Sequence, residues 1–339
     1  MLRIGILGTG RIARVFAAEV RSSAKVVVAA VASRDVRQAR SFANDFGIAR
    51  AYQGYEDLLA DPEVDGVYNA LPSSLHAPWS ISAAEAGKHV LCEKPLATCT
   101  DEVRRMFAAA ERNAVRIVEA YPYRAQPHTL ALRRLIAEGA IGTVRMIEAS
   151  FGFPMPQAGD FRFDPSLGGG ALLDAGSYPV SFVRMISGSA PAHVSATARF
   201  GPSGVDHAVA ASLDHEDGPM AQISCAFGIA PYRRAVIVGD GGVIETSYPN
   251  RPSRAFPSAL IVTRGSGWDI EPRRIEIEAV RPFLAQAESF ADMIHGGDAQ
   301  WTGASPAESL DIAITLDAIA ESARTGHAVS LPASPAQPP

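Results

Sequence analysis

The sequence predicts an α/β domain built on a parallel sheet, followed by an α+β domain whose strands are mostly antiparallel. Up to roughly residue 123, short apolar runs alternate with segments of helical periodicity, the order typical of strands joined by crossover helices. Beyond this point, polar and apolar residues alternate, and hairpin-like turns occur at Asp217–Gly218 and 239–242. The expected divisions are a first domain at 1–122, a second domain at 123–330 and a Pro-rich tail at 331–339.

The expected strands of the first domain are short apolar runs separated by helical segments. The strands are 2–8, 25–33, 65–72, 88–95 and 115–121. The helices are 10–23, 35–47, 55–64, 76–87 and 98–114. Gly47 and Gly87 are expected to end two of these helices, because glycine readily adopts the left-handed conformation found after a helix C-terminus. Pro62 is expected to stop a third helix.

In the second domain, alternation predicts strands and apolar periodicity predicts helices. The strand-forming stretches are 143–153, 192–201, 206–228, 233–249 and 258–265. Helices are expected at 128–140, 285–297 and 304–326, and another is expected to start near Ala171. The Pro-rich end of the chain is expected to fray.

Composition and charge exclude several classes of partner. The chain has 339 residues, of which 20% are charged, and a net charge of −5, which argues against general affinity for nucleic acid or an anionic membrane. No apolar run is long enough to span a bilayer. Cys92, Cys99 and Cys225 lack metal-ligand spacing, so we expect reduced thiols and a cytoplasmic location. The histidines are scattered, and no metal site is expected.

A glycine-rich turn near the N-terminus indicates a dinucleotide site. Residues 8–13, GTGRIA, match G-x-G-x-x-[GA] between a predicted strand and a predicted helix. Gly8 permits the tight turn, Gly10 lets a pyrophosphate approach the backbone, and Ala13 lets the helix pack closely on the strand. The alternative is a turn without a ligand, but its position in a strand–helix series favours binding. The residues expected to bind cofactor here are Gly8, Thr9, Gly10, Arg11 and Ile12.

The end of the second strand favours NADP over NAD. An NAD site usually has an acidic residue here, which binds the ribose 2′-hydroxyl, but this strand ends with Ser33 and Arg34. A hydroxyl followed by a guanidinium suits a 2′-phosphate. Arg11, in the first loop, is expected to be close enough to help bind this phosphate. The alternative is that Arg34 is a solvated loop residue and Asp35 binds a ribose hydroxyl.

The stretch HVLCEKPLA, residues 89–97, ends a later strand with charges. Lysine is rare in this chain and occurs only as Lys25, Lys88 and Lys94. Because ligands bind at the carboxyl ends of parallel strands, Lys94 is expected to point into the nicotinamide site. The alternative is a structural pair between Glu93 and Lys94.

These motifs resemble the glucose–fructose oxidoreductase / inositol dehydrogenase (Gfo/Idh/MocA) family over nearly the whole chain. The resemblance rests on GILGTGRIA, VYNALPSSLHAPWSISAAEAGKHVLCEKPLA, EAYPYR and LGGGALLDAGSYPV, in that order. It implies a Rossmann-type domain and a second domain with a large, mostly antiparallel open sheet. It also implies NAD(P)-dependent oxidation or reduction of a sugar, polyol or related compound, a Lys94–Pro95 bond that is often cis, and assembly into a homodimer or homotetramer through the open sheet face.

The family's second catalytic element resembles GGGALLDAGSYPV, residues 168–180. Many relatives have Asp-x-Gly-x-His, whereas this chain has Tyr178 at the histidine position. A tyrosine there resembles the branch of dimeric dihydrodiol dehydrogenases and NADP-dependent aldose (xylose) dehydrogenases. Asp174 and Tyr178 are four residues apart and are expected on one helical face.

The chemistry of alcohol oxidation assigns roles to these residues. A phenol is a poor base near neutral pH, but a neighbouring ammonium favours the phenolate. We therefore expect Tyr178 to be the acid/base, Lys94 to orient the hydroxyl and favour proton transfer, and Asp174 to bind substrate or position Lys94. The alternative is that Tyr178 is an amphipathic residue whose hydroxyl lies at a surface.

Other residues receive weaker assignments. The loop expected to line the cofactor contains Leu71, Pro72, Ser74 and His76. Glu93 is expected to bind a nicotinamide-ribose hydroxyl or to structure Lys94, while Tyr121, Tyr123, Arg124 and Arg162 either touch substrate or pack. The expected function is therefore an NADP-dependent oxidoreductase of a sugar, polyol or dihydrodiol. The alternatives are a keto-sugar reductase and a non-catalytic NADP-binding regulator.

Overall fold

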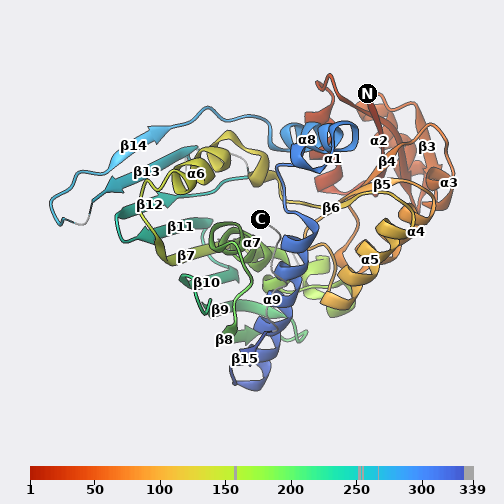
Figure 1. The fold of residues 1–339 in the computed structure, drawn as a ribbon. Coiled ribbons are helices and arrows are strands. Elements are labelled where there is room, and N and C mark those ends of the chain that lie inside the picture. Colours follow the sequence, from red (N-terminus) through yellow and green to blue (C-terminus); the bar gives the residue numbers. More distant parts are fainter. Residues whose placement is uncertain (156–158, 251–252, 254–255, 266, 332–339) are drawn as a thin grey trace. The chain divides into compact units, whose positions relative to one another are not determined.

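The computed structural model describes residues 1–155, 159–250, 253, 256–265 and 267–331, and the chain divides into two compact units (Figure 1). Unit 1 combines Met1–Ala125 with Val280–Ser309, and unit 2 combines Gln126–Ala279 with Leu310–Pro339. The expected Pro-rich tail lies outside the described residues, except for Leu331.

Unit 1 contains a six-stranded parallel sheet with the strand order β3-β2-β1-β4-β5-β6. Its strands are β1 (Leu2–Leu7), β2 (Val26–Ser33), β3 (Arg50–Gln53), β4 (Gly66–Asn69), β5 (His89–Glu93) and β6 (Ile117–Ala120). The predicted parallel sheet is therefore confirmed. The sequence did not predict β3, because RAYQ is a short edge strand without an apolar run.

The helices of unit 1 are α1 (Arg11–Val20), α2 (Val36–Phe46), α3 (Glu56–Leu59), α4 (His76–Glu85), α5 (Thr100–Arg112) and α8 (Pro282–Gly296). Gly47 follows α2 with a φ of 70°, as predicted for its C-terminus. Helix α3 ends at Leu59, earlier than expected, because the residue before Pro62 is disfavoured in helical conformation. Short 3₁₀ turns occur at η1 (Ser73–Leu75), η2 (Pro122–Ala125) and η6 (Asp298–Gln300).

The core of unit 1 joins segments that are far apart in sequence. Phe16 of α1 stacks on Tyr68 of β4, with ring centroids 3.9 Å apart, and meets Phe283 of α8 edge-on. The backbone N–H of Phe283 donates to the carboxylate of Glu19 at 2.9 Å. These contacts fix α8 against α1 and hold the first helix in place behind the glycine-rich turn.

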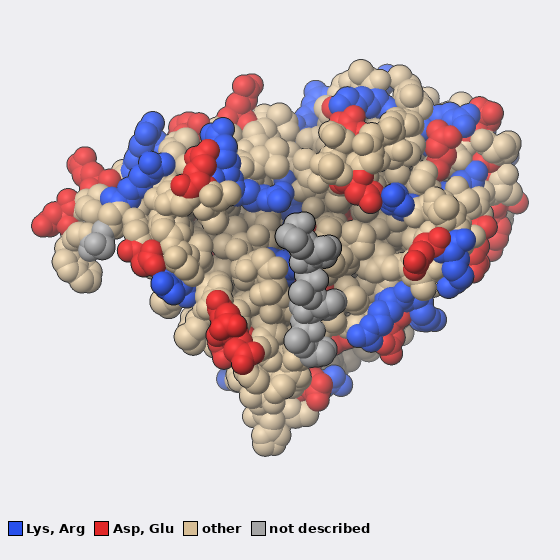
Figure 2. Space-filling model, in the orientation of Figure 1, with Lys and Arg blue, Asp and Glu red and all other residues tan. Residues whose placement is uncertain are grey.

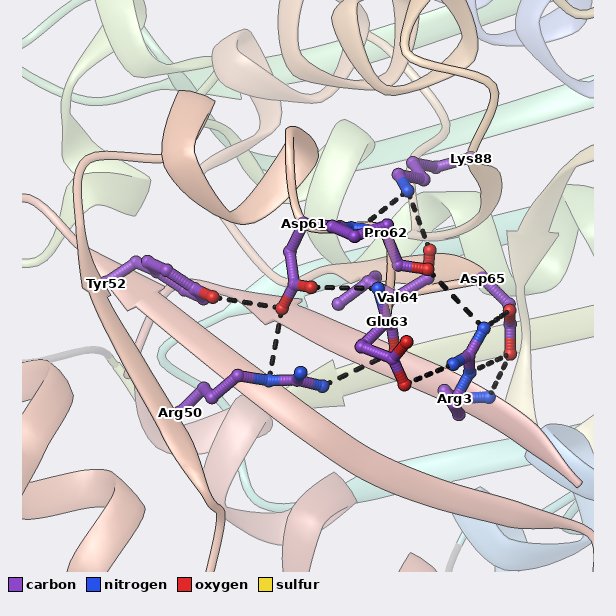
Figure 3. A network of polar contacts seen from close by, with 9 residues as sticks. All are labelled: Arg3, Arg50, Tyr52, Asp61, Pro62, Glu63, Val64, Asp65 and Lys88. Carbon is purple, nitrogen blue, oxygen red and sulfur yellow. Dashed lines mark hydrogen bonds and ion pairs between the residues drawn. The ribbon is translucent and has the colours of Figure 1, made fainter.

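A polar network closes the edge of this sheet where β1, β4 and β5 begin (Figure 3). The guanidinium of Arg3 binds Asp65 and Glu63, each through a nitrogen–oxygen distance of 2.6 Å. The ammonium of Lys88 donates to the carbonyl oxygens of Asp61 and Val64, both at 2.8 Å. The network leaves the opposite edge, where the parallel strands end, for the ligand-binding loops.

Unit 2 contains a nine-stranded sheet with the strand order β14-β13-β12-β11-β7-β10-β9-β8-β15. Its strands are β7 (Val144–Phe153), β8 (His193–Phe200), β9 (Asp206–Asp214), β10 (Met220–Phe227), β11 (Tyr232–Gly239), β12 (Gly242–Thr246), β13 (Ala259–Arg264), β14 (Arg273–Glu276) and β15 (Val329–Ser330). All pairs are antiparallel except β7 with β10. The predicted large, mostly antiparallel sheet is confirmed; the sequence did not predict β14 and β15, which are short and largely polar.

Burial alternates along the strands of this sheet. Ile147 and Ala149 of β7 are buried, whereas Met146 and Glu148, which alternate with them, are exposed. Helix α7 (Ser177–Ser187) packs on β7 and β10, and α6 (Pro127–Ala137) packs near β13. Among the described residues of unit 2, helices therefore cover one face of the sheet, and the other face, called the open face, carries the exposed side chains.

The remaining long helix is α9 (Pro306–Thr325). Within the described ranges, we find no helix of the length and apolar character required to cross a membrane. Acidic and basic side chains are interspersed on the face drawn in Figure 2. This distribution agrees with the mixed composition and small net charge of the sequence.

Candidate active site

The glycine-rich turn has the geometry that a phosphate requires. Gly8 has a φ of +95°, which favours glycine, and Gly10 precedes α1 in an extended conformation. No side chain caps the N-terminus of α1, and a Cβ on Gly10 would meet nothing within 4 Å. Ala13 is fully buried against the sheet. The first N–H groups of α1 are therefore accessible to a phosphate.

Asp35, the acidic residue that follows β2, is bound to Arg37. The side chain of Asp35 accepts a hydrogen bond from the backbone N–H of Arg37 at 2.8 Å and also pairs with its guanidinium. The Arg37 side chain holds the pKa of Asp35 below its usual value. Asp35 thus caps α2, while the neighbouring Arg34 is exposed and Ser33 is buried.

The loop after β4 is fixed by a buried imidazole. The His76 ring is 1% exposed, and its nitrogens lie 2.8 Å from the carbonyl oxygen of Leu71 and 2.7 Å from that of Pro95. Burial lowers the pKa of His76, although both carbonyl oxygens oppose this shift. The imidazole therefore ties the loop after β4 to the loop after β5.

Contacts on both sides of Lys94 position its backbone. The Tyr68 hydroxyl donates to the carboxylate of Glu93, and the Leu96 N–H donates to Glu119 at 2.9 Å. The Lys94–Pro95 bond is cis. Lys94 is partly exposed between buried neighbours, so its side chain starts from a backbone that is held from both directions.

The EAYPYR segment is packed inside unit 1. Tyr121 and Tyr123 are fully buried, and the buried Arg124 pairs with Glu308 at 2.9 Å. Glu119 is 1% exposed, and burial raises its pKa to about 7. These aromatic side chains therefore pack within unit 1, and their contact with substrate remains a prediction.

In unit 2, a π-helical turn carries the second group of predicted residues. This turn, η5 (Leu172–Gly176), contains Asp174 and leads directly into α7. π-helical turns occur frequently at functional sites. That Asp174 and Tyr178 share one helical face remains a prediction, with Asp174 in the π turn and Tyr178 in the first turn of α7.

Asp174 and Tyr178 have different hydrogen-bond partners. The Nε of Arg162 donates to the Asp174 carboxylate at 2.5 Å, and the same guanidinium pairs with Asp160 at 3.0 Å. Asp174 and Asp160 raise the pKa of Arg162, against the effect of its burial. Arg162 is therefore a partner of Asp174, which the sequence alone did not reveal.

The Tyr178 side chain is 6% exposed and lies on the covered sheet face. Its hydroxyl accepts a hydrogen bond from the amide of Asn250 at 2.7 Å. Its ring meets Phe151 edge-on, with centroids 5.0 Å apart, and Arg233 lies over the ring at 4.5 Å. The sequence analysis missed Asn250 and Arg233; the signal for Arg233 was its inward position in the alternating strand β11.

This fold and these side chains define a class of protein: a dinucleotide-binding domain followed by an α+β domain that carries titratable groups. Residues 2–121 match the family model described as "Oxidoreductase family, NAD-binding Rossmann fold", and residues 129–245 match "GFO/IDH/MocA C-terminal domain". The chain belongs to the Gfo/Idh/MocA family, and it is an NAD(P)-dependent oxidoreductase that acts on hydroxyl or keto groups.

Similar proteins with known activities fall within the expected branch. The chain is 34% identical to D-xylose 1-dehydrogenase (NADP(+)) 2 of Haloferax volcanii, with 97% of this chain and 100% of the relative covered. It is 37% identical to trans-1,2-dihydrobenzene-1,2-diol dehydrogenase of Mus musculus, with 72% and 74% covered. A 3-ketoreductase from Actinomadura kijaniata, solved with NADP and TDP-benzene, has a TM-score of 0.86 and 30% identity, with 95% and 97% covered. The predicted family and branch are confirmed.

Proposed function

We propose that this enzyme is an NADP-dependent dehydrogenase of a sugar, polyol or dihydrodiol. One observation carries this proposal: in this member of the family, Tyr178 is buried and its hydroxyl accepts a hydrogen bond from Asn250. The names of the xylose and dihydrodiol dehydrogenases support the substrate class. A nicotinamide cofactor held at the glycine-rich turn would supply the hydride acceptor, so the residues of this chain must remove the proton of the substrate hydroxyl.

The preference for NADP follows from the end of β2. Asp35 is engaged as the cap of α2, which leaves the exposed Arg34 and the hydroxyl of Ser33 to bind a 2′-phosphate. Arg34 supplies the charge and Ser33 a hydrogen bond. The similar D-xylose dehydrogenase is named for NADP, which supports the same choice.

The rest of the cofactor site combines the turn with the loops after β4 and β5. In this proposal the residues that bind the cofactor are Gly8, Thr9, Gly10, Arg11, Ile12, Ser33, Arg34, Leu71, Pro72, Ser74, His76, Glu93 and Lys94. His76 contributes by holding the Leu71 and Pro95 carbonyls, because its ring is buried. Glu93 has Tyr68 as a partner, which favours a role in structuring the lysine loop.

Tyr178 is the proposed acid/base. During oxidation the substrate hydroxyl gives its proton to the Tyr178 oxygen, and Lys94 orients that hydroxyl and favours the phenolate. Asp174, anchored by Arg162, holds the π-helical turn that precedes Tyr178. The similar 3-ketoreductase has been solved as a variant with one lysine replaced and, separately, as a variant with one tyrosine replaced. These variants support the proposal that a lysine and a tyrosine act together in catalysis.

A keto-sugar reductase is the second candidate, and the similarity to the 3-ketoreductase favours it. The same residues serve reduction, with Tyr178 donating the proton. We also propose a homodimer or homotetramer that assembles through the open face of the unit 2 sheet, and a cytoplasmic location consistent with unpaired cysteines.

The deciding experiment is a screen of nicotinamide absorbance with aldoses, polyols, trans-dihydrodiols and keto-sugars, each tested with NADP(H) and NAD(H). We expect turnover with at least one member of these classes and faster turnover with NADP(H). Binding of NADP without turnover of any class would instead favour the non-catalytic regulator.

A further inference from the structure

Strand β11 buries an arginine beside Tyr178. Arg233 points to the covered sheet face, where it is 8% exposed, and its register partner on β7 is Phe151. The next residue, Arg234, points to the open face and pairs with Glu245 at 2.5 Å. The alternation of the strand therefore separates two adjacent arginines into a paired surface residue and a buried one.

Aromatic rings surround the buried guanidinium. The Arg233 Cζ lies 4.2 Å from the ring centroid of Phe151, 4.5 Å from that of Tyr178 and 5.0 Å from that of Tyr248. Contacts between a desolvated cation and the faces of aromatic rings stabilise the cation. The rings hold the guanidinium in one place, but they carry no compensating charge.

Arg233 differs in this respect from other inward-facing arginines of unit 2. Arg162 pairs with Asp174, and the buried Arg184 pairs with Asp311 at 2.6 Å. Among the described residues, Arg233 has no acidic partner, and its buried Nε and Nη2 have no hydrogen-bond acceptor. Because an uncompensated buried charge is costly, a group that becomes negative beside it is strongly favoured.

The titratable side chains around Arg233 differ in whether they can take up a negative charge beside its guanidinium. The Tyr248 hydroxyl donates to the Ser150 carbonyl at 2.8 Å, so its proton is engaged. Asp174 is paired with Arg162, burial raises the pKa of the Cys225 thiol on β10, and burial lowers the pKa of His128, which contacts Thr246. On β7 and β12, Glu148 and Glu245 belong to the open face.

Tyr178 remains, and its hydrogen bond has the matching polarity. The amide Nδ2 of Asn250 donates to the Tyr178 oxygen at 2.7 Å, and a phenolate accepts such a bond more strongly than a phenol. The Arg233 guanidinium over the ring and the Asn250 amide N–H at the oxygen thus both direct positive charge toward the Tyr178 side chain. Arg233 belongs to strand β11 and Asn250 to the segment after β12. Both contact Tyr178 only because the folded chain brings these segments together.

We propose that Arg233 is a positioning residue that stabilises the Tyr178 phenolate from within unit 2, in addition to the contribution of Lys94. The inference rests on the proposed role of Tyr178 as acid/base. During oxidation the phenolate takes the substrate's hydroxyl proton and becomes a phenol as hydride leaves carbon for the nicotinamide. During reduction the phenol returns that proton to the oxygen of the carbonyl.

Two neutral variants test this role. Arg233→Gln keeps polarity, and Arg233→Met suits the aromatic surroundings because methionine packs well against rings. Each should lower kcat for oxidation near neutral pH by about tenfold and move the acidic limb of the pH–rate profile up by about one unit. NADP binding should be unchanged, since Arg233 is not in the nucleotide-binding unit. Arg233→Lys, which keeps the charge, should leave the limb near its original position.

Matched measurements separate the alternatives. Arg134→Gln removes an exposed arginine of α6 and should not affect the profile. In a Tyr178→Phe background, Arg233→Gln should have no further effect on the limb, because groups that act as a unit are non-additive. If Tyr178→Phe is fully active, the proposed function of Tyr178 fails. If Tyr178→Phe is inactive but neutral Arg233 variants raise only KM, Arg233 binds substrate and this inference is wrong. If neither neutral variant folds, the charge serves folding and the inference is likewise abandoned.

Discussion

The three lysines of the chain have distinct environments. Lys25 forms an ion pair with Asp292 at 2.7 Å, and Lys88 donates to two backbone carbonyl oxygens. Both serve the packing of unit 1. Lys94 instead follows a strand whose end is anchored by Glu93 and Leu96, at the edge where a parallel sheet binds ligands. At the scale of single residues, context separates a structural lysine from a candidate catalytic one.

Removal of the Arg34 guanidinium should reduce the preference for NADP. A charge-assisted contact with a phosphate contributes about 1.5–3 kcal/mol, so Arg34→Ala should weaken NADPH binding by tenfold or more and leave NADH binding nearly unchanged. Fluorescence titration with both cofactors measures this. Arg37→Ala, which removes the exposed partner of Asp35, is the neighbouring control. Equal affinity of the unmodified enzyme for NADPH and NADH would contradict the assignment.

Substitution of Tyr178 and substitution of Lys94 should each lower turnover, and their effects should not add. Tyr178→Phe keeps the ring contact with Phe151 but removes the hydroxyl, so turnover should fall by about 10²–10⁴-fold while cofactor binding survives. Lys94→Ala should lower turnover at least as much, and the double variant should be little worse than either single variant. Steady-state kinetics on a verified substrate checks this. Near-normal turnover of Tyr178→Phe would show that the tyrosine only packs.

The buried Glu119 should make stability depend on pH. Its folded-state pKa of about 7 lies above the ordinary value, so the fold keeps a proton that the unfolded chain loses. Stability should therefore fall as pH rises from about 4.5 to about 7, by up to about 3 kcal/mol. Glu119→Gln cannot ionise and can still accept from Leu96, so its stability relative to the original protein should increase over this range.

Urea unfolding at about pH 5 and about pH 8 measures the difference. Glu111→Gln, which removes an exposed carboxylate of α5, is the matched control. A constant difference between Glu119→Gln and the original protein at both pH values would show that Glu119 ionises normally in the fold.

At the scale of elements, a glycine and a buried carboxylate position the π-helical turn. Gly170 has a φ of +114°, and a Cβ there would lie 2.4 Å from Oδ1 of Asp206. The other carboxylate oxygen of Asp206 accepts from the backbone N–H of Leu172 at 2.6 Å. Asp206 therefore fixes the start of the turn that leads to Tyr178, and only a residue without a side chain fits beside it.

Gly170→Ala should destabilise unit 2 and slow turnover together. The positive φ alone costs about 1 kcal/mol for alanine, and displacing Asp206 should add about 1–3 kcal/mol. Gly188→Ala is the matched control, because Gly188 has a φ of 79° and its Cβ would meet nothing within 4 Å. Thermal unfolding and kcat of the two variants separate strain from displacement. Equal effects of both substitutions would show that Asp206 adjusts freely.

At the scale of the whole molecule, the open face of the unit 2 sheet concerns assembly. Met146 and Met220 are register partners on β7 and β10, and are 45% and 62% exposed. Burial of these two apolar side chains by another chain would remove their surface from water. This pair is therefore the most direct place to test self-association.

The unmodified enzyme should have a light-scattering mass of two or four times 35.8 kDa at micromolar concentration. Replacing Met146 and Met220 with glutamate should lower this mass to that of one chain, because two desolvated carboxylates would oppose each other across the interface. Leu130→Glu, at an exposed position on α6, should not change it. A monomeric mass of the unmodified enzyme would contradict the proposed assembly.

Local order was predictable from the sequence because it depends on neighbouring residues. The turn at residues 8–13, the strand that precedes Lys94 and the helix end at Gly47 are contiguous patterns, and each is found within a residue or two of its predicted place. Short polar strands such as β3 were not predictable, because they lack an apolar pattern and form only by pairing with a neighbour. The end of β2 could suggest a cofactor, but only the structure shows Asp35 capping α2.

The sequence by itself determined the class of fold, the dinucleotide turn and the identities of Lys94, Asp174 and Tyr178 as candidates. Tertiary structure alone decided their surroundings: Arg162 at Asp174, and Arg233 and Asn250 at Tyr178. The physical reason is the separation along the chain. Strand pairing between β7 and β11 brings Phe151 beside Arg233, and such long-range contacts depend on how the whole sheet closes its core rather than on any local pattern.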